Sequence, residues 1–153
     1  MTDATFRVSQ WPMAYFARAE RAHQRNANEL LRPFGLKHTE WRMLALAGEL
    51  GEVSVTDLAE QVVIERTTIG KAVARLVEKG WLTKASCALD GRSVRVQLTA
   101  QGKRLVHDTT PLIVALMQRY QHALDDADYD AFFHALRRYE RRVTAGVAKG
   151  VAQ

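Results

Sequence analysis

The hydrophobic periodicity changes within residues 53–99, which read VSVTDLAEQVVIERTTIGKAVARLVEKGWLTKASCALDGRSVRVQLT. A short helix is predicted over residues 55–61, because Ser54 followed three residues later by Asp57 resembles a capping box. A second helix is predicted over residues 66–79, where four apolar residues recur at helical spacing: Ile69, Ala72, Val73 and Leu76. Two helices joined by such a brief link predict a helix-turn-helix.

A β-hairpin is expected directly after these helices. Gly80 ends the second helix, residues 81–89 read as a strand, and Asp90 with Gly91 is a strong hairpin-turn signal. The strand that follows alternates three apolar residues with polar ones: Val94, Val96 and Leu98. A helix-turn-helix followed by a two-stranded wing is the layout of a winged helix-turn-helix, which delivers its second helix to the major groove of DNA.

Long helices are predicted on both sides of this unit. Residues 12–31 predict a first helix with Pro12 in its first turn, and a second helix is expected to start after Thr39 as the N-cap and to end at Gly51. The apolar positions expected on that second helix are Trp41, Leu44, Ala45 and Leu50. Thr99 is expected to cap a long helix that reaches about residue 124.

A final helix is predicted after a cluster of acidic residues, which favour the positive end of a helix dipole: Asp125, Asp126, Asp128 and Asp130. Its apolar stripe requires a partner surface and consists of Phe132, Leu136, Tyr139 and Val143. The predicted fold class is therefore mainly α, a winged helix-turn-helix with a small β-hairpin wing between long N- and C-terminal helices.

Charge and composition restrict the function classes. The 153 residues are 47% hydrophobic and 25% charged, which is typical of a soluble globular protein, and we expect a cytoplasmic one with no membrane partner. The longest clean apolar run, residues 112–117, is too short to span a bilayer. Residues 65–103 hold eight Lys or Arg against three acids, an excess equal to the net charge of +5. Such a concentrated basic excess is expected for a polyanion partner.

The predicted docking face for double-stranded DNA is the outward side of the second helix, Thr67, Gly70, Lys71 and Ala74, within an arc of about 80°. Arg66 and Lys71 can donate to guanine acceptors or phosphates, and Thr67 and Thr68 can contact base edges. A glycine at position 70 lowers helix stability by about 1 kcal/mol relative to alanine. Either Gly70 permits close approach to a groove wall, or it is a neutral replacement without a function.

Three arginines flank the docking face. Arg75 is expected to contact the DNA backbone rather than bases, the alternative being a plain surface charge. Arg92 and Arg95 lie just beyond the hairpin turn, where long cations can enter an adjacent minor groove. Alternatively, Arg92 pairs with Asp90 and stiffens the wing.

The run DGRSVRVQLTAQGK, residues 90–103, resembles the wing signature of the multiple-antibiotic-resistance regulator (MarR) family, of which it keeps Asp90, Arg92, Leu98, Thr99 and Gly102. The stretch TTIGKAVARLVEKGWL, residues 67–82, is similar to the recognition helix of that family. The resemblance covers nearly all of residues 12–147. It implies a homodimeric transcriptional regulator on an inverted-repeat operator, with half-sites about one duplex turn apart. It also implies three segments, a dimerisation helix in 1–36, the DNA-binding unit in 37–99 and dimerisation helices in 100–153.

The same resemblance implies a small-molecule effector, because members of the family commonly release DNA when an aromatic or phenolic ligand binds. The matching positions are Trp11, Tyr15, Arg18, His38, Trp41 and Arg42. Aromatic walls with one or two cations suit a planar carboxylate, whereas the alternative is that these residues are ordinary core. We therefore expect a repressor of a neighbouring gene that such a ligand releases; the alternatives are a ligand-independent regulator and a helical protein-interaction adaptor.

Enzyme, metal and redox chemistry find little support. No phosphate loop, nucleophile elbow or metal-hydrolysis motif occurs, and we predict no catalytic residue and no cofactor. The five histidines, His23, His38, His107, His122 and His134, show no close metal-ligand spacing. The single cysteine, Cys87, falls in the predicted wing strand and is interpreted as a small strand residue; the alternative is that its oxidation perturbs DNA docking. The peroxide-sensing branch of the family carries its cysteine near the start of the first helix, where residues 11–16 have none.

Overall fold

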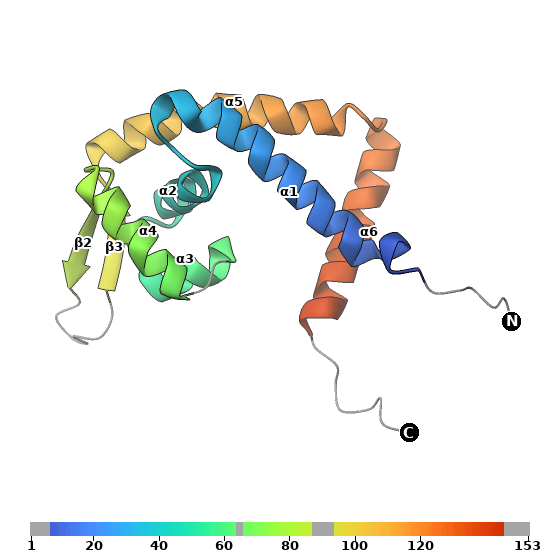
Figure 1. Cartoon of the computed structure of the whole chain (residues 1–153), viewed down its shortest axis with the longest axis horizontal. Coiled ribbons are helices and arrows are strands. Elements are labelled where there is room, and N and C mark those ends of the chain that lie inside the picture. Colours follow the sequence, from blue (N-terminus) through green and yellow to red (C-terminus); the bar gives the residue numbers. More distant parts are fainter. Residues whose placement is uncertain (1–6, 64–65, 87–93, 146–153) are drawn as a thin grey trace, which may run out of the picture. The chain divides into compact units, whose positions relative to one another are not determined.

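The computed structural model describes residues 7–63, 66–86 and 94–145 (Figure 1). Its elements in chain order are η1 (Val8–Gln10), α1 (Pro12–Leu31), η2 (Arg32–Phe34), α2 (His38–Leu50), β1 (Val53–Ser54), α3 (Val55–Val62), α4 (Arg66–Glu78), β2 (Leu82–Ser86), β3 (Val94–Leu98), α5 (Ala100–Gln121) and α6 (Asp126–Thr144). They form two compact units, Met1–Ile113 and Val114–Gln153. The mainly α winged-helix class predicted from the sequence is confirmed.

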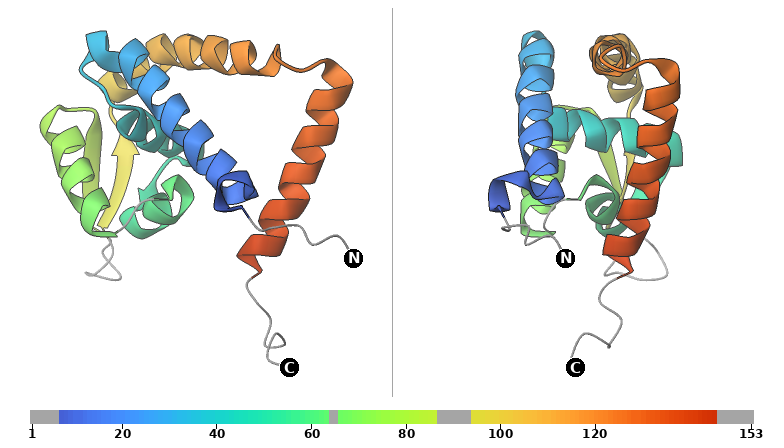
Figure 2. Two further views of the ribbon diagram at one scale, coloured as in Figure 1. Left: turned by 45° about the vertical axis from the view of Figure 1, so that its right-hand side comes forward. Right: turned by 90° about the vertical axis from the view of Figure 1, so that its right-hand side faces the viewer.

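The sheet has one strand more than the two-stranded wing predicted. Its order is β1-β3-β2, and both pairings are antiparallel. Val53 of β1 pairs with Val96 of β3, while Leu82 of β2 pairs with Leu98. Figure 2 gives two further views of the sheet beside α3 and α4. The additional strand is β1, whose pairing depends on a strand more than forty residues later and has no local signal. The hairpin turn, Asp90 and Gly91, lies outside the described residues.

The core of the first unit lies where α2, α3 and α4 meet the sheet. The fully buried side chains include Leu44 of α2, Leu58 of α3, Leu76 of α4 and Val96 of β3. Figure 1 shows α2 between α1 and the pair formed by α3 and α4. Burying this apolar face is what holds the short α3, because a helix of eight residues is marginal by itself.

The start of α2 corrects a sequence prediction. The helix begins at His38 with Lys37 as its N-cap, two residues before the start that Thr39 as N-cap implied. The Glu40 carboxylate accepts a hydrogen bond from the Lys37 backbone N–H at 2.9 Å, and the Asn28 side chain of α1 accepts one from His38 N–H at 2.7 Å. Asn28 is distant in sequence, so cap preferences alone could not locate this start. The inward face also differs, since Leu50 is 49% exposed.

Three predicted helix starts are confirmed by their caps. The Ser54 hydroxyl accepts from Asp57 N–H at 3.0 Å, and the Thr99 hydroxyl accepts from Gly102 N–H at 2.9 Å. At α6 the Asp125 carboxylate accepts from Asp128 N–H at 2.8 Å. Helix α5 ends at Gln121, three residues before the predicted end.

None of the helices in the described ranges combines the length and the apolar character that crossing a membrane requires.

Candidate nucleic-acid interface

Helix α4 separates an inward apolar face from an outward polar one. Its inward residues are buried as predicted: Ile69, Ala72, Val73 and Leu76. The described outward residues are exposed: Thr68, Gly70, Lys71 and Ala74. The side chains of Arg66 and Thr67 lie outside what the structure describes. Because one face of α4 is anchored in the core, the other face is free to meet a partner.

Gly70 has no structural reason to be a glycine. It adopts no positive φ, and a Cβ built at this position meets nothing within 4 Å. A glycine in a helix interior costs about 1 kcal/mol relative to alanine. The protein therefore carries this cost without any benefit inside the described fold.

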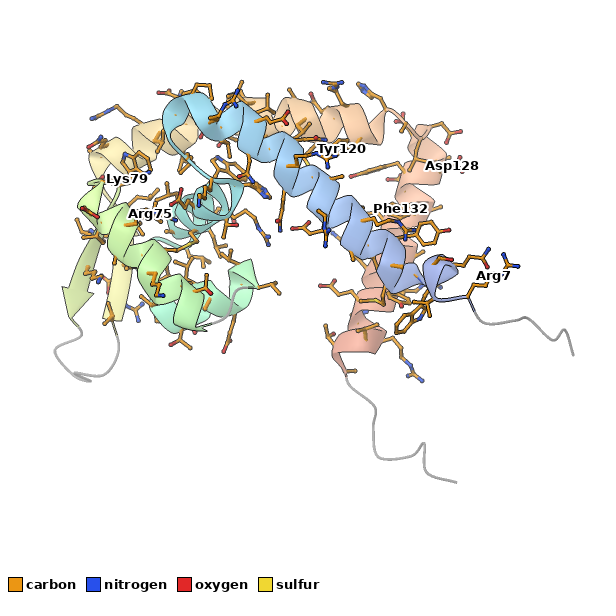
Figure 3. All side chains as sticks on the ribbon, in the orientation of Figure 1. Arg7, Arg75, Lys79, Tyr120, Asp128 and Phe132 are labelled. Atoms are coloured by element: carbon orange, nitrogen blue, oxygen red, sulfur yellow. The ribbon has the colours of Figure 1, made fainter. Side chains whose placement is uncertain are left out.

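Lys71 and Arg75 differ in what they contact. In the described part of the chain, no residue forms an ion pair with the exposed Lys71. Arg75, one turn later, points back to α2, where its Nε lies 2.6 Å from Oε1 of Glu40, a side chain only 3% exposed (Figure 3). Lys79 is also held, because its Nζ donates to the Gly35 carbonyl at 2.7 Å.

Arg95 of the wing is bound as well. Its Nε lies 2.6 Å from Oε1 of Glu52, and its terminal nitrogen donates to the Glu52 carbonyl at 2.9 Å. Glu52 precedes β1, so this contact follows from the β1–β3 pairing. The sequence analysis did not identify Glu40 and Glu52 as the partners of these arginines. The position of Glu40, three residues after the N-cap, could have indicated its capping role, whereas nothing local in the sequence indicates the role of Glu52. Asp90, Arg92 and Cys87 lie outside the described residues.

Comparison with known proteins finds similar transcriptional regulators. Residues 34–93 match the MarR family model. The chain is 29% identical over 122 residues to the HTH-type transcriptional repressor IacR of Pseudomonas putida, covering 80% of this chain and 73% of that protein. The winged-helix region of this chain is therefore similar to that of the MarR family.

Solved structures of MarR-family proteins share the fold. The S. aureus MepR–DNA complex superposes with a TM-score of 0.80 at 16% identity, covering 86% of this chain and 98% of that chain. The PcaV regulator of Streptomyces coelicolor, solved with its natural ligand, gives 0.74 at 23% identity, covering 90% and 97%. At these identities the likeness establishes the winged-helix architecture.

The six residues expected to bind a ligand in this chain fall into two groups. Trp11 and Tyr15 are exposed at the N-terminal end of α1, and the Arg18 guanidinium lies 4.5 Å from the centre of the Tyr15 ring. His38, Trp41 and Arg42 lie together on α2. Arg42 is 3.8 Å from Glu20 of α1.

His38 is the most perturbed of these residues. Its Nε2 lies 3.2 Å from Nε2 of His23, and its ring is parallel to that of Trp41 at a centroid distance of 6.2 Å. Burial first, and then the charges of His23 and Arg42, lower the pKa of His38 from its usual 6.5 to about 4, against the opposite effect of Glu20. His38 is therefore neutral at physiological pH.

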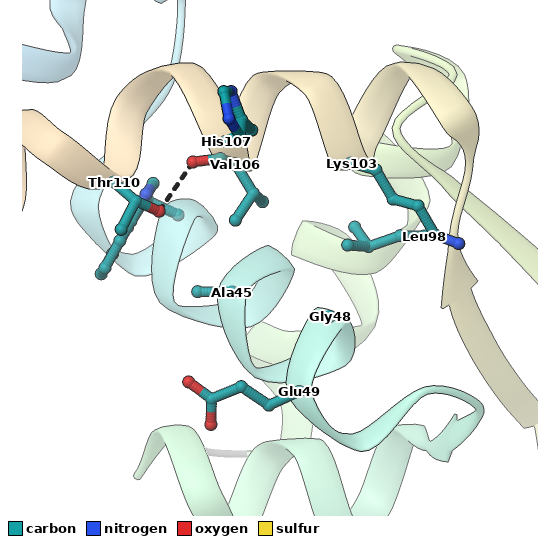
Figure 4. A pocket seen from close by; sticks show the side chains of 9 residues that line it. Ala45, Gly48, Glu49, Leu98, Lys103, Val106, His107 and Thr110 are labelled. Carbon is teal, nitrogen blue, oxygen red and sulfur yellow. Dashed lines mark hydrogen bonds between the residues drawn. The ribbon is translucent and has the colours of Figure 1, made fainter.

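A cavity of about 390 Å³ lies between α2 and α5 (Figure 4). Its lining comes from α2, β3 and α5: Trp41, Ala45, Gly48, Glu49, Leu98, Lys103, Val106, His107 and Thr110. Trp41 is the one member of the predicted ligand set that contributes to it. The side of the cavity formed by α5 could have been predicted from the sequence, because helical spacing places four residues on one face: Lys103, Val106, His107 and Thr110.

The cavity combines apolar walls with polar groups of both charge signs, since the carboxylate of Glu49 also lines it. Lys103 is cationic, and His107 is exposed beside it one turn along α5. The indole Nε1 of Trp41 is buried and has no hydrogen-bond partner in the described residues. No three His, Cys, Asp or Glu side chains in the described ranges are placed to hold a metal ion. The arrangement therefore offers a small polar ligand a cation, an imidazole and a carboxylate beside apolar walls.

Proposed function

We propose that this protein is a homodimeric repressor that reads an inverted-repeat operator through α4 and the wing, and that a small aromatic carboxylate releases it. The single observation that carries the DNA-reading part is the outward face of α4. There Lys71 forms no ion pair with any described residue and stands beside Gly70, which the described part of the fold does not require. The similarity to IacR, described as a transcriptional repressor, supports repression.

The base-reading residues in this proposal are Arg66, Thr67, Thr68, Gly70, Lys71 and Ala74 of α4. Lys71 suits guanine or phosphate acceptors, and Gly70 lets the groove wall approach the helix backbone. Arg92 enters the minor groove or pairs with Asp90. Arg95 has a smaller part than its sequence position suggests, because Glu52 already neutralises it.

The exposed apolar stripe of α6 supports a second copy of this chain as partner. Phe132 is 49% exposed, Tyr139 36% and Val143 51%, whereas large apolar side chains at this spacing normally face a core. A face of this kind along one helix is typical of an oligomer interface. The dimer would present two α4 helices to two half-sites.

The cavity beside Trp41 is the proposed effector site. Lys103 and His107 supply donors for a carboxylate, and the Trp41 ring supplies an apolar wall. The solved complex of PcaV with its natural ligand supports ligand binding in a protein of this fold. A ligand switches the protein only if it binds the two conformations unequally, and a coupling of about 1 to 3 kcal/mol suffices.

The decisive experiment selects a duplex from a randomised library with the wild-type protein and measures its affinity by gel shift at fixed salt. We expect Lys71→Ala with Arg92→Ala to abolish binding of the selected duplex while the protein stays folded. A matched control is Arg104→Ala with Arg119→Ala, which removes the same charge from exposed positions of α5. Failure of the library to yield any preferred duplex would favour the protein-interaction adaptor instead.

A further inference from the structure

We propose that Arg75 is a positioning residue, which holds the recognition helix α4 against α2 through an ion pair with the buried carboxylate of Glu40. Its guanidinium does not contact DNA phosphate. This inference rests on the DNA-binding function and assigns a residue that the sequence alone placed at the DNA backbone.

The Glu40 carboxylate is built into the start of α2. One oxygen accepts from the Lys37 backbone N–H at 2.9 Å, and the other lies 2.6 Å from Arg75 Nε. The side chain is only 3% exposed, so its charge has lost most of its water and requires a cation. Arg75 is the described cation that meets this need. Drawing Arg75 away to a phosphate would leave a buried carboxylate without its counter-charge, which is strongly unfavourable.

A second contact holds the same side of α4. Lys79, one turn after Arg75, donates to the Gly35 carbonyl at 2.7 Å and lies 4.6 Å from the centre of the Trp81 ring. Arg75 and Lys79 therefore bind the segment from Gly35 to Glu40, which contains the turn before α2 and the first residues of α2. Among the described residues, the cations in and directly after α4 divide into two classes, because Lys71 forms no ion pair with any described residue while Arg75 and Lys79 each bind a group of the protein.

The ion pair matters for specificity because base reading depends on geometry. A hydrogen bond to a base edge weakens when the helix rotates or shifts, whereas attraction to the phosphate backbone tolerates such shifts. Loss of the Glu40–Arg75 contact should therefore reduce discrimination between sequences more than it reduces general affinity for DNA.

The test measures affinities for two duplexes over a salt series, the one selected from a random library and a scrambled one of equal composition. The variants are Glu40→Gln, Arg75→Gln and their combination. Glu78→Gln, an exposed acid on α4, controls for the change in net charge of Glu40→Gln. We expect Glu40→Gln to bind the selected duplex about tenfold more weakly, with less than about twofold change on the scrambled duplex. A merely structural role would lower the active fraction equally for both duplexes and leave their ratio unchanged.

The variants separate positioning from phosphate contact by the sign of one effect. If Arg75 contacted phosphate, Glu40→Gln would release it and tighten binding to both duplexes. Arg75→Gln would then weaken both and reduce the salt slope by about 0.9. Positioning predicts instead an unchanged slope for Arg75→Gln and a double variant no less selective than the worse single variant, since both remove one interaction. A tighter Glu40→Gln, or a reduced slope for Arg75→Gln, overturns the proposal. If Glu40→Gln does not fold, the slope for Arg75→Gln decides alone.

Discussion

The Nε2 atoms of His23 and His38 lie 3.2 Å apart, between α1 and the first turn of α2. At this distance one ring donates and the other accepts, so at least one of the two must be neutral. His38 is also buried, and its Nδ1 has no acceptor in the described part of the chain. Protonation of His38 would therefore place a charge and an unpaired donor inside the fold.

This arrangement predicts acid sensitivity. Because folding lowers the pKa of His38 from 6.5 to about 4, the unfolded chain takes up this proton first as pH falls. The free energy of unfolding should be unaffected by this group above about pH 6.5 and should fall progressively down to about pH 4, by about 3 kcal/mol in all. Urea unfolding of the wild type and of His38→Gln at pH 7.5, 6, 5 and 4 measures this fall. Equal pH dependence in both proteins would contradict the assignment, and His134→Gln, exposed on α6, is the control.

Gly70→Ala should change stability and DNA binding in opposite directions. The added methyl meets no atom of the protein and removes a helix-interior glycine, so we expect a gain of about 0.5 to 1 kcal/mol in the free energy of unfolding. The same methyl projects from the docking face, so affinity for the selected duplex should fall. Thermal melting and gel shift on one preparation check both effects. An affinity equal to that of the wild type would remove Gly70 from the docking face.

Gly102→Ala should be strongly destabilising. A Cβ at this position would clash with the carbonyl oxygen of Trp81, and the Thr99 hydroxyl that caps α5 bonds the backbone N–H of Gly102 itself. Relief requires movement of the backbone at the base of the wing, which costs about 1 to 3 kcal/mol or more. Denaturant unfolding measures this cost. The same substitution at Gly70 serves as the matched control, and a stable Gly102→Ala protein would show that the wing can move away from α5.

Lys103→Gln should weaken the response to an effector. Removing the cation from the wall of the cavity should raise the concentration of salicylate or benzoate needed for half release of DNA, by about tenfold if the carboxylate meets this side chain. Affinity in the absence of these probes should stay the same. Fluorescence anisotropy of a labelled duplex follows the release. Arg104→Gln, the next residue, is exposed and outside the cavity, so an equal effect there would attribute the change to general charge.

Phe132→Glu should dissociate the proposed dimer. The substitution places a carboxylate in the apolar stripe of α6, where burial against a second copy would cost several kcal/mol. Size-exclusion chromatography with light scattering reads the mass directly. His134→Glu lies about 200° around the same helix and should keep the wild-type mass. A wild-type protein that runs as a monomer, or an unchanged mass for Phe132→Glu, would move the partner surface elsewhere.

Much of the fold could be predicted because its signals are local. The Ser54, Thr99 and Asp125 caps each need only a residue three positions away, and the buried stripe of α4 follows from helical spacing. The start of α2 could not be predicted in this way, since Asn28 completes its cap from another helix. The third strand likewise depends on a long-range pairing of Val53 with Val96.

The sequence by itself determined the order of helices, the wing strand alternation and the exposed side of α4, because these depend on periodicity and on neighbours within one turn. Only the tertiary structure decided which cations remain available to a partner. Lys71 and Arg75 are one turn apart on the same helix, yet Glu40 of α2 holds Arg75, and Glu52 holds Arg95. A charge is neutralised by what lies near it in space, and the residues that approach it come from elements whose packing no local pattern encodes.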